Sequence, residues 1–319
     1  MNRRTFLSGS PLLPASLWSA CGSAPKRVIG VVPKGTSSTF WQPVYSGAMA
    51  AGRDFEVEVL WEAPDEETDI ARQIEIVEGF IQRGVDGIVL APSGRRPLVP
   101  AVEQAAAAGI PVTIFDSGID TDHYVSYVAT DNRAAGGMAA KAVADLLNGK
   151  GTIGMIKHVP GSDSTEEREQ GFSEAIRLLA PKLRVVASEY CMSFRARALS
   201  VAKEMLAAYP NLGALFGSSE AATMGAMRAL GVPGQQRRVK LVGFDASFSL
   251  REGLRDDVVD ALVAQDPFYI GYAGVKTVVQ KLNGVEPPKR IDSPARLVTA
   301  AHLDDADIVK LLDPPGAPR

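Results

Sequence analysis

Short β-branched runs alternate with helical stretches along most of this chain, and this alternation limits its possible folds more than any other feature. Val28–Val32 has the composition of a buried strand, and Pro33–Thr39 follows it with turn-forming and hydroxyl residues. A helical pattern then runs over Phe40–Arg53. Repetition of this strand–loop–helix unit produces a parallel sheet with helices on both faces, so we expect an α/β fold.

The alternation continues almost to the end of the chain and predicts more strands than one sheet holds. In the first half we expect strands over Glu56–Trp61, Gly87–Ala91, Val112–Phe115 and Tyr124–Ala129, and helices over 70–81, 98–108 and 134–147. In the second half we expect strands over Thr152–Lys157, Arg184–Glu189, Ala214–Gly217, Lys240–Phe244 and Ala261–Ala264, and helices over 164–179, 198–209, 220–230, 248–255 and 267–282. Roughly ten strands exceed the content of one doubly wound sheet, which indicates two similar α/β lobes.

Two local patterns bear on later arguments. Ser164-Thr165-Glu166-Glu167 has the pattern of a capping box, which predicts that the helix through Leu179 begins there. The tail from Glu286 is rich in proline and charge, and it predicts only a short helix near Asp304–Leu312.

The size and charge of the chain exclude some classes of function. At 319 residues it is long enough for two domains, each with its own core. Its 46% hydrophobic and 22% charged residues are typical of globular proteins. The net charge is −3 and no stretch is rich in lysine and arginine, which argues against nucleic acid as a partner because phosphate contacts need clustered cations.

The first residues have the pattern of an export signal rather than of part of the fold. Arg3 and Arg4 precede Phe6-Leu7 and a short apolar segment, a pattern that resembles a twin-arginine signal. The apolar segment is too short to span a bilayer, which needs roughly 20 apolar residues. We therefore treat residues 1–26 as an export signal and linker, and we expect the protein outside the cytoplasm.

The segment 17–21, LWSAC, resembles a bacterial lipoprotein processing site, with small residues before a cysteine. We expect cleavage before Cys21 and a lipid on that cysteine, which would be the protein's only attachment to the membrane. The other cysteine, Cys191, then has no disulfide partner within the chain.

Polar side chains follow most of the predicted strands, at the point where each strand ends. They are Lys34, Asp116-Ser117, the segment 158–164, Ser218-Ser219-Glu220, Asp245 and Gln265-Asp266. Ligands of open parallel sheets bind beyond the carboxyl ends of the strands, so two such edges that face each other form a polar cleft. Carboxylates, amides and arginine bind vicinal hydroxyls, and aromatic rings cover apolar C–H faces, so this cleft suits a small polyhydroxylated ligand.

Several of the candidate residues also have a purely structural explanation. Phe40 and Trp41, at a predicted helix start, could belong to the core, although two adjacent rings cannot both face the same core. Arg168 could pair with Glu166 or Glu169 on the surface of its own helix, an interaction that contributes little to stability.

Motifs of common enzymes are absent from the sequence. It lacks Gly-x-Ser-x-Gly, Gly-x-Gly-x-x-Gly after a strand, a phosphate-binding loop and His-Glu-x-x-His. Its histidines, His123, His158 and His302, lie far apart and without metal-ligand spacing. We therefore expect no catalytic residues, no metal and no cofactor.

Four segments, in their order and spacing, identify a family. They are VVPKGTSSTFW, then GVDGIVLAP with GIPVTIFDSG, then VATDN, and finally LVGFDAS with ALVAQDPFYIG. Over essentially its whole mature length the chain resembles the type I periplasmic sugar-binding proteins of ABC importers, in particular the ribose-binding group. The resemblance implies two Rossmann-like, doubly wound parallel-sheet lobes, joined by a three-strand hinge, which close around a monosaccharide.

The resemblance also implies where the chain crosses between the lobes, namely near Asp131, near Gln265 and near Asp292. The N-terminal lobe would comprise residues 27–130 plus 266–291, and the C-terminal lobe residues 131–265 plus 292–312. Residues 313–319 would form a disordered tail.

Positions that contact the sugar in the ribose-binding group carry residues of the same type here. The aromatic pair that sandwiches the sugar is matched by Phe40 and Trp41. The carboxylate after the fourth strand, the arginine one turn before Gly-Phe, the Gly-Phe-Asp carboxylate and the hinge glutamine are matched by Asp116, Arg168, Asp245 and Gln265. The second-lobe aromatic falls on Phe194 or, in another register, on Ser193, and we assign Phe194.

Other positions depart from the pattern of the ribose-binding group. Serines replace an asparagine before the aromatic pair, an arginine after the first carboxylate, and an asparagine before the seventh helix, namely at Ser38, Ser117 and Ser219. Glu220 lies beside the last of these, and Lys34 adds a cation that the ribose binders lack. We include all five among the ligand-binding candidates. The loss of an arginine at Ser117 and the gain of Lys34 change the positions of the hydrogen-bond donors, which argues against ribose as the ligand.

The resulting prediction is a monomeric receptor that binds a monosaccharide or polyol and delivers it to an ABC permease by hinged closure. A sensory binding protein for a chemoreceptor or histidine kinase is the alternative, since Pro33-Lys34 and Asp116-Ser117 also resemble binding proteins for the furanosyl autoinducer. A sugar-responsive repressor shares this core, but it requires a DNA-binding segment where this chain carries an export segment.

Overall fold

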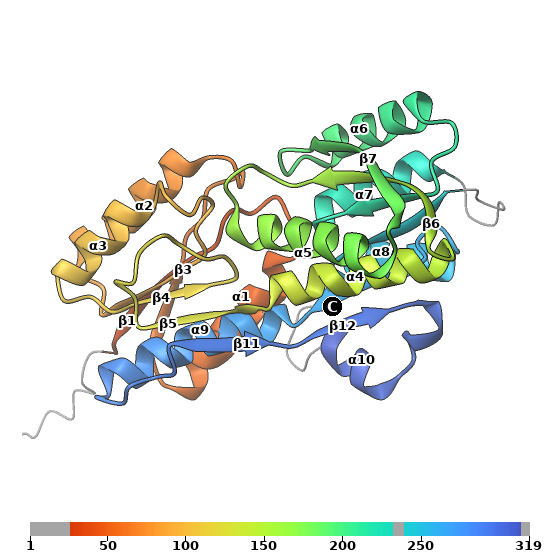
Figure 1. Ribbon diagram of the computed structural model, residues 1–319. Coiled ribbons are helices and arrows are strands. Elements are labelled where there is room, and N and C mark those ends of the chain that lie inside the picture. Colours follow the sequence, from red (N-terminus) through yellow and green to blue (C-terminus); the bar gives the residue numbers. More distant parts are fainter. Residues whose placement is uncertain (1–25, 232–238, 314–319) are drawn as a thin grey trace, which may run out of the picture.

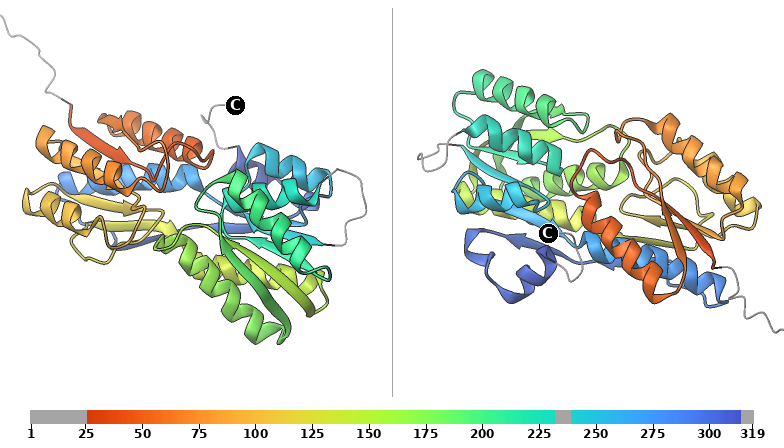
Figure 2. Two further views of the ribbon diagram at one scale, coloured as in Figure 1. Left: turned by 90° about the horizontal axis from the view of Figure 1, so that it is seen from above. Right: turned by 180° about the vertical axis from the view of Figure 1, so that it is seen from behind.

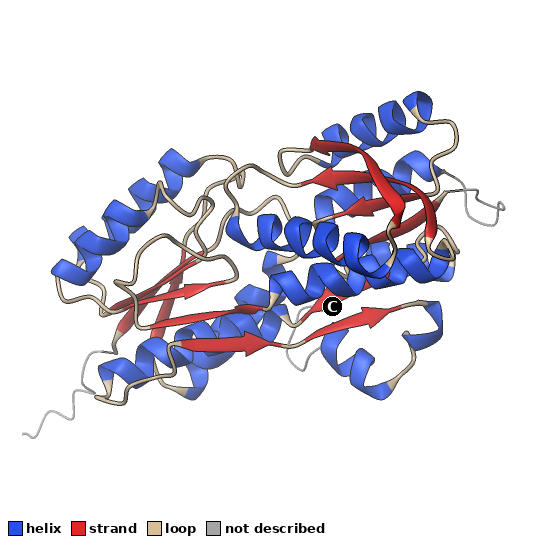
Figure 3. Cartoon of the chain, in the orientation of Figure 1, coloured by secondary structure: helices blue, strands red, loops and turns tan. Residues whose placement is uncertain are grey.

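The protein consists of two α/β lobes in the computed structural model, which describes residues 26–231 and 239–313 (Figures 1 and 2). Each lobe holds a sheet between layers of helices (Figure 3). Cys21, the rest of the predicted export signal, and residues 314–319 of the predicted tail lie outside the described residues. None of the described helices is long and apolar enough to cross a membrane.

The first lobe contains a six-stranded, all-parallel sheet with the strand order β11-β5-β4-β3-β1-β2. Its strands are β1 (Val28–Val32), β2 (Glu58–Trp61), β3 (Gly87–Leu90), β4 (Val112–Phe115), β5 (Ser126–Thr130) and β11 (Arg290–Ser293). Its helices are α1 (Trp41–Asp54), α2 (Ile70–Arg83), α3 (Val99–Ala107) and α9 (Pro267–Leu282). One apolar core lies between the sheet and the pair α1 and α9, and another lies between the sheet and the pair α2 and α3.

The second lobe repeats this plan with the strand order β12-β10-β9-β8-β6-β7, except that the edge strand β12 runs antiparallel to β10. Its strands are β6 (Lys150–Lys157), β7 (Lys182–Tyr190), β8 (Ala214–Gly217), β9 (Lys240–Phe244), β10 (Ala261–Gln265) and β12 (Ala295–Val298). Its helices are α4 (Asn132–Leu146), α5 (Asp163–Leu179), α6 (Arg195–Ala208), α7 (Glu220–Leu230), α8 (Phe248–Arg255), the 3-10 helix η1 (Ala300–His302) and α10 (Ala306–Leu312). The helices α4 and α5 cover one face, and α6, α7 and α8 cover the other.

The chain crosses between the two sheets three times, after β5, after β10 and after β11. The first two crossings lead into α4 and α9 at Asp131 and Asp266, whose side chains cap those helices by accepting from the backbone N–H three residues on. The third falls at Pro294, beyond the expected position near Asp292, because β11 stays paired with β5 as far as Ser293. Proline has no N–H to donate to a ladder, so the strand ends there.

One prediction of local structure is wrong, and in one region local patterns missed strands. The helix α5 begins at Asp163 with Ser162 at its N-cap, so Ser164 lies inside the first turn and does not head a capping box. The segment 290–298, in which local patterns marked no strand although the resemblance implied a hinge strand near Asp292, forms β11 and β12. Both are half-exposed edge strands, which lack the continuous apolar run that marks a buried strand in a sequence.

Glycines bring two helices of each lobe unusually close together. A Cβ atom on Gly47 of α1 would lie 2.0 Å from the Phe268 carbonyl oxygen of α9. A Cβ on Gly136 of α4 would lie 2.1 Å from the Arg168 carbonyl oxygen of α5. In each lobe, therefore, the helix that begins at a crossing packs backbone to backbone against a helix with a candidate ligand-binding residue. The helix α9 packs on α1, which carries Trp41, and α4 packs on α5, which carries Arg168.

Candidate ligand-binding site

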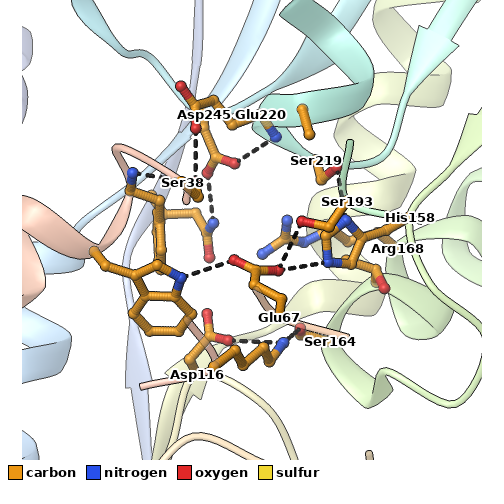
Figure 4. A pocket seen from close by; sticks show the side chains of 16 residues that line it. Ser38, Glu67, Asp116, His158, Ser164, Arg168, Ser193, Ser219, Glu220 and Asp245 are labelled. Carbon is orange, nitrogen blue, oxygen red and sulfur yellow. Dashed lines mark hydrogen bonds and ion pairs between the residues drawn. The ribbon is translucent and has the colours of Figure 1, made fainter. Parts of the chain in front are cut away.

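A cavity lies between the two lobes, at the carboxyl ends of both sets of strands (Figure 4). It encloses about 380 Å³ of space, part of which is open to solvent. All of the residues predicted to bind a ligand line it except Ser117 and Phe194. Six further residues line it, namely Glu67, His158, Ser164, Thr165, Ser193 and Ala221. Of these, His158 and Ser164 belong to the strand-end segment 158–164, and Ser193 was the alternative to Phe194.

Aromatic rings form one side of the cavity, at the start of α1. Trp41 is 4% exposed, and its indole N–H donates to Glu67 Oε1 at 2.8 Å. Phe40, at the N-cap of α1, lies edge-on to Trp41 with ring centroids 5.1 Å apart. The rings are held perpendicular rather than parallel, and Phe115 at the end of β4 packs against Trp41 from behind at 6.1 Å.

Lys34 follows β1 and is buried against the second lobe. Its ammonium lies 3.0 Å from the carboxylate of Asp116, and it donates to the hydroxyls of Ser162 at 3.2 Å and Ser164 at 3.0 Å. An ammonium has three N–H donors, so these three contacts use all of them. The charge of Lys34 is therefore balanced by Asp116, and its N–H groups are all engaged within the protein.

Glu67 is the main residue that sequence reasoning missed. It lies in the loop after β2, and Figure 4 shows its carboxylate and the His158 ring pointing toward each other. His158 Nε2 is 2.9 Å from Glu67 Oε2, and the hydroxyl of Ser193 donates to the same oxygen at 3.2 Å. His158 and Ser193 belong to the second lobe, so one carboxylate of the first lobe bridges the cleft. The strand-end rule that selected Lys34 applies to this loop as well.

The pKa of the Glu67 carboxyl is lowered to about 2. Burial alone would raise it, because removal from water disfavours the charged form. The hydrogen bond and charge of His158, the charge of Lys34 and the hydrogen bond from Trp41 outweigh burial. Glu67 is therefore a buried, ionised group at neutral pH.

Arg168 projects into the cavity from α5 and does not pair with Glu166 or Glu169. Its Nε donates to Asn132 Oδ1 at 2.8 Å, and its Nη1 donates to the Ser218 carbonyl at 3.2 Å. Its guanidinium also lies 4.4 Å from the ring centroid of Phe244. Among the described residues no hydrogen-bond acceptor is found for Nη2, so this nitrogen can donate to a ligand.

Asp116 and Asp245 occupy equivalent places in the two lobes, directly after β4 and β9. Both have left-handed backbone conformations, with φ of 60° and 67°, which non-glycine residues rarely adopt. Gln265 Nε2 donates to Asp245 Oδ1 at 2.7 Å, and the Glu220 N–H donates to Oδ2 at 3.0 Å. Burial raises the pKa of Asp245, and nearby Arg168 opposes that rise. Strained backbone at paired positions beside a cavity is typical of functional sites.

Ser38 and Glu220, two of the candidates that differ from the ribose-binding group, contact each other. The Ser38 hydroxyl donates to Glu220 Oε2 at 2.6 Å, and the Thr39 hydroxyl donates to Oε1 at 2.6 Å. Arg195 pairs with the same carboxylate at 3.0 Å from within the second lobe. Glu220 thus extends from the second lobe to the first, whereas Glu67 extends from the first lobe to the second.

Two predicted residues lie outside the cavity. Ser117 is fully buried beneath it, where its hydroxyl accepts the Ser164 N–H at 3.1 Å. Phe194 is 41% exposed, which corrects its assignment as a ligand-facing aromatic. Met192 and Ser193 both have positive φ, so the chain turns sharply before α6 and directs Ser193 inward instead of Phe194.

The described residues offer little for metal binding or nucleophilic chemistry. No cluster of three or more His, Cys, Asp or Glu side chains there could hold a metal ion. Burial raises the pKa of the Cys191 thiol to about 12, which keeps it protonated and unreactive.

Comparison with known proteins places this chain in a family. The periplasmic binding protein domain matches residues 29–286. The ribose import binding protein of Bacillus subtilis is 31% identical over 235 residues, which cover 74% of this chain and 75% of that protein.

Solved structures similar to this chain are also solute-binding proteins. A carbohydrate transporter solute-binding protein from Agrobacterium radiobacter, in complex with D-arabinose, has a TM-score of 0.88 and 30% identity, and the match covers 91% of this chain and 100% of that one. An ABC transporter solute-binding protein from Agrobacterium vitis with bound D-fucose has a TM-score of 0.85 and 36% identity, covering 89% and 99%.

The predicted fold class and the resemblance on which it was based are confirmed by the two parallel-sheet lobes and by these matches. The matched proteins are binding proteins of transport systems and not enzymes, in agreement with the absence of catalytic motifs from the sequence. The chain belongs to the periplasmic binding protein domain family.

Proposed function

We propose that this protein is an extracytoplasmic receptor that binds a monosaccharide or polyol between its lobes and delivers it to an ABC permease. The observation that carries the proposal is the cavity itself, which is lined by aromatic rings, carboxylates, an arginine and an amide from both lobes. The import and transporter names of the relatives support transport rather than the sensory alternative.

Hinged closure follows from the burial of the lining residues. Trp41, Asp116, Arg168 and Gln265 are each less than 5% exposed, so a sugar cannot reach them while the lobes are together. Within residues 26–231 and 239–313 the chain links the lobes at Asp131, Asp266 and Pro294 alone, which gives the lobes a common hinge. Contacts made to both lobes exist only in the closed state, so a bound sugar shifts the equilibrium toward closure.

The ligand we propose is uncharged. Lys34, the cation that could have met an acidic sugar, already contacts Asp116 and two serines with all three of its N–H groups. Buried carboxylates of Glu67, Glu220 and Asp245 also face the cavity and would repel an anion.

Direct contacts to the sugar are assigned to the side chains that keep hydrogen-bonding or stacking capacity in the cavity. These are Phe40, Trp41, Asp116, Arg168, Asp245 and Gln265. Lys34, Ser38, Ser219 and Glu220 line the same cavity but are engaged with protein partners, and we assign them to shaping it.

The finer features of this receptor are also proposals. The lobes would comprise residues 27–130 plus 266–293 and residues 131–265 plus 295–312, with Pro294 between them. The protein would be exported as a monomer through the twin-arginine signal and anchored by a lipid on Cys21. Mass spectrometry of the mature protein that finds Cys21 unmodified would remove the anchor.

A thermal-shift screen of residues 24–319 tests the function. The panel contains pentoses, hexoses, polyols, sugar acids and the furanosyl autoinducer. Ligand at 100 times its dissociation constant stabilises the folded protein by about 2.7 kcal/mol, a shift of a few degrees. We expect a neutral sugar to give this shift. Stabilisation by sugar acids alone would contradict the assignment of Lys34, and stabilisation by the autoinducer alone would contradict the sugar-receptor function.

A further inference from the structure

A polar contact outside the cavity also joins the lobes. Arg95, in the loop after β3, forms an ion pair with Asp163, the first residue of α5. The other oxygen of Asp163 accepts the Gly118 N–H at 2.9 Å and lies 3.4 Å from the Tyr127 hydroxyl. The Arg95 N–H donates to the Gly161 carbonyl at 3.1 Å. Arg95, Gly118 and Tyr127 belong to the first lobe, and none of these residues lines the cavity.

The Asp163 side chain is only 9% exposed, so it depends on the first lobe for its charge partner. Among the described residues, no other pair of a lysine or arginine with a carboxylate joins the two lobes. Arg95 is 37% exposed and also lies 3.3 Å from Asp120 within its own lobe. Neighbouring Arg96 pairs with the same Asp120 at 3.1 Å, and its side chain is 85% exposed. No ion pair or side-chain hydrogen bond joins Arg96 to the described part of the second lobe.

We propose that Arg95 and Asp163 determine the sugar affinity of this protein by holding the closed state, although neither touches the sugar. This inference rests on the proposed function. The contacts of Asp163 with the first lobe exist only while the lobes are together, so they favour closure whether or not a sugar is bound. An apparent dissociation constant equals the intrinsic one divided by the fraction of binding-competent protein, so a weaker closed state raises it. Since the contact forms after the sugar has entered, its loss accelerates release more than it slows binding.

The test compares Arg95→Gln with Arg96→Gln. Arg96→Gln is a matched control, because it removes a positive charge from the same loop and an ion pair with the same Asp120. D-Arabinose, D-fucose and D-ribose are tested, and the one that binds wild type most tightly is followed by stopped-flow tryptophan fluorescence, because Trp41 lines the cavity. We expect Arg95→Gln to release the sugar about three- to tenfold faster with an association rate within about twofold of wild type. Arg96→Gln should match wild type in both rates.

Ionic strength supplies a second readout that a loss of folding would not reproduce. The affinity of a protein for an uncharged sugar does not depend on salt unless charges meet during closure. The Arg95–Asp163 pair is partly exposed and is therefore screened, whereas the buried Glu67–His158 contact is screened much less. Wild type and Arg96→Gln should lose affinity between low salt and about 1 M NaCl. Arg95→Gln should show little dependence.

Asp163→Asn provides an independent variant, in which the side chain keeps its size and loses its charge. It should release the sugar faster, like Arg95→Gln. Normal release from both variants, or equal effects of Arg95→Gln and Arg96→Gln, would overturn this proposal and leave the proposed function intact. If wild type bound no sugar in the panel, the proposed function and this inference would both fail.

Discussion

At the scale of single residues, the positions that depart from the ribose-binding pattern all have polar partners within the protein. Ser38 donates to Glu220, and Lys34 pairs with Asp116 and with serines of the second lobe. Buried polar groups without partners are costly, so a changed residue in a closed cleft requires a changed partner. The cavity therefore combines candidate ligand-facing groups with polar contacts between the lobes.

Glu67→Gln is expected to change how stability depends on pH. The pKa of Glu67 is lowered to about 2 against an ordinary value of 4.5, with burial outweighed by His158, Lys34 and Trp41. A carboxyl with a lowered folded pKa stabilises the folded state above its unfolded pKa, and that stabilisation is lost as the pH falls toward the folded pKa. Between pH 6 and pH 3, the unfolding free energy of sugar-saturated wild type should fall by on the order of 2 kcal/mol more than that of Glu67→Gln.

Urea unfolding at each pH measures this difference. Asp65→Asn is the control, because Asp65 lies exposed in the same loop and should leave the pH dependence of wild type unchanged. If the unfolding free energies of wild type and Glu67→Gln depended on pH in the same way, the Glu67 carboxylate would not be a buried anion that bridges the lobes.

At the scale of elements, the helices that begin at the crossings support the helices that face the ligand. The pair α4 and α5 approach so closely at Gly136 that no side chain fits between their backbones. Arg168, which faces the cavity, contributes the very carbonyl that Gly136 contacts. The position of Arg168 in the cavity is therefore tied to the helix that follows the first crossing.

Gly136→Ala should weaken both folding and sugar binding. Its Cβ would meet backbone atoms 2.1 Å away, which cannot yield without moving α5 and Arg168. We expect a loss of about 1–3 kcal/mol in the free energy of unfolding, measured in urea, together with a weaker sugar titration. The neighbouring Gly137→Ala is the control, since its Cβ would meet only Ala175 Cβ at 3.9 Å. It should stabilise the helix by up to about 1 kcal/mol, and equal effects of the two substitutions would contradict this packing.

At the scale of the whole molecule, closure is maintained by carboxylates that extend from each lobe into the other. Glu67 reaches the second lobe, while Glu220 and Asp163 reach the first. Each is buried in the closed arrangement and would be hydrated when the lobes part. Hydration of these carboxylates in the open state therefore opposes the contacts that they make in the closed state, and a bound sugar adds contacts to the closed state alone.

Small-angle X-ray scattering should detect this shift. The radius of gyration of the unliganded protein should fall when a sugar found in the thermal-shift screen is added to saturation, because the lobes rotate together about their three crossings. Trp41→Ala, which removes the main aromatic wall, should bind the sugar weakly and should not become more compact at the same concentration. An unchanged radius of gyration in sugar-saturated wild type would exclude hinged closure.

Much of this arrangement could be predicted from local patterns. Apolar runs such as Val28–Val32 and Val112–Phe115 coincide with β1 and β4, because a strand buried on both faces needs apolar residues throughout. The rule that polar residues at strand ends face a cleft selected Lys34, Asp116 and Asp245, and the structure places all three in one cavity.

Other features depend on contacts that no local pattern reveals. Glu67 belongs to an acidic loop that is typical of a solvated surface, and only the approach of the second lobe makes it a buried bridge. Phe194 seemed the better cavity residue than Ser193 by type, yet two consecutive positive φ values direct the smaller side chain inward. The sequence marked Lys34 as a cation near the ligand, but its contacts with Asp116 in its own lobe and with Ser162 and Ser164 across the cleft use all of its donors.

The sequence by itself therefore determined the α/β class, the two-lobe plan and the strand ends from which a polar cleft is built. These follow from side-chain periodicity and strand-end chemistry, which act over a few residues. The tertiary structure alone decided which polar groups are engaged with each other across the cleft and which still face the cavity. That outcome depends on distances between side chains separated by about a hundred positions, such as Glu67 and His158, and burial gives those distances their energetic weight.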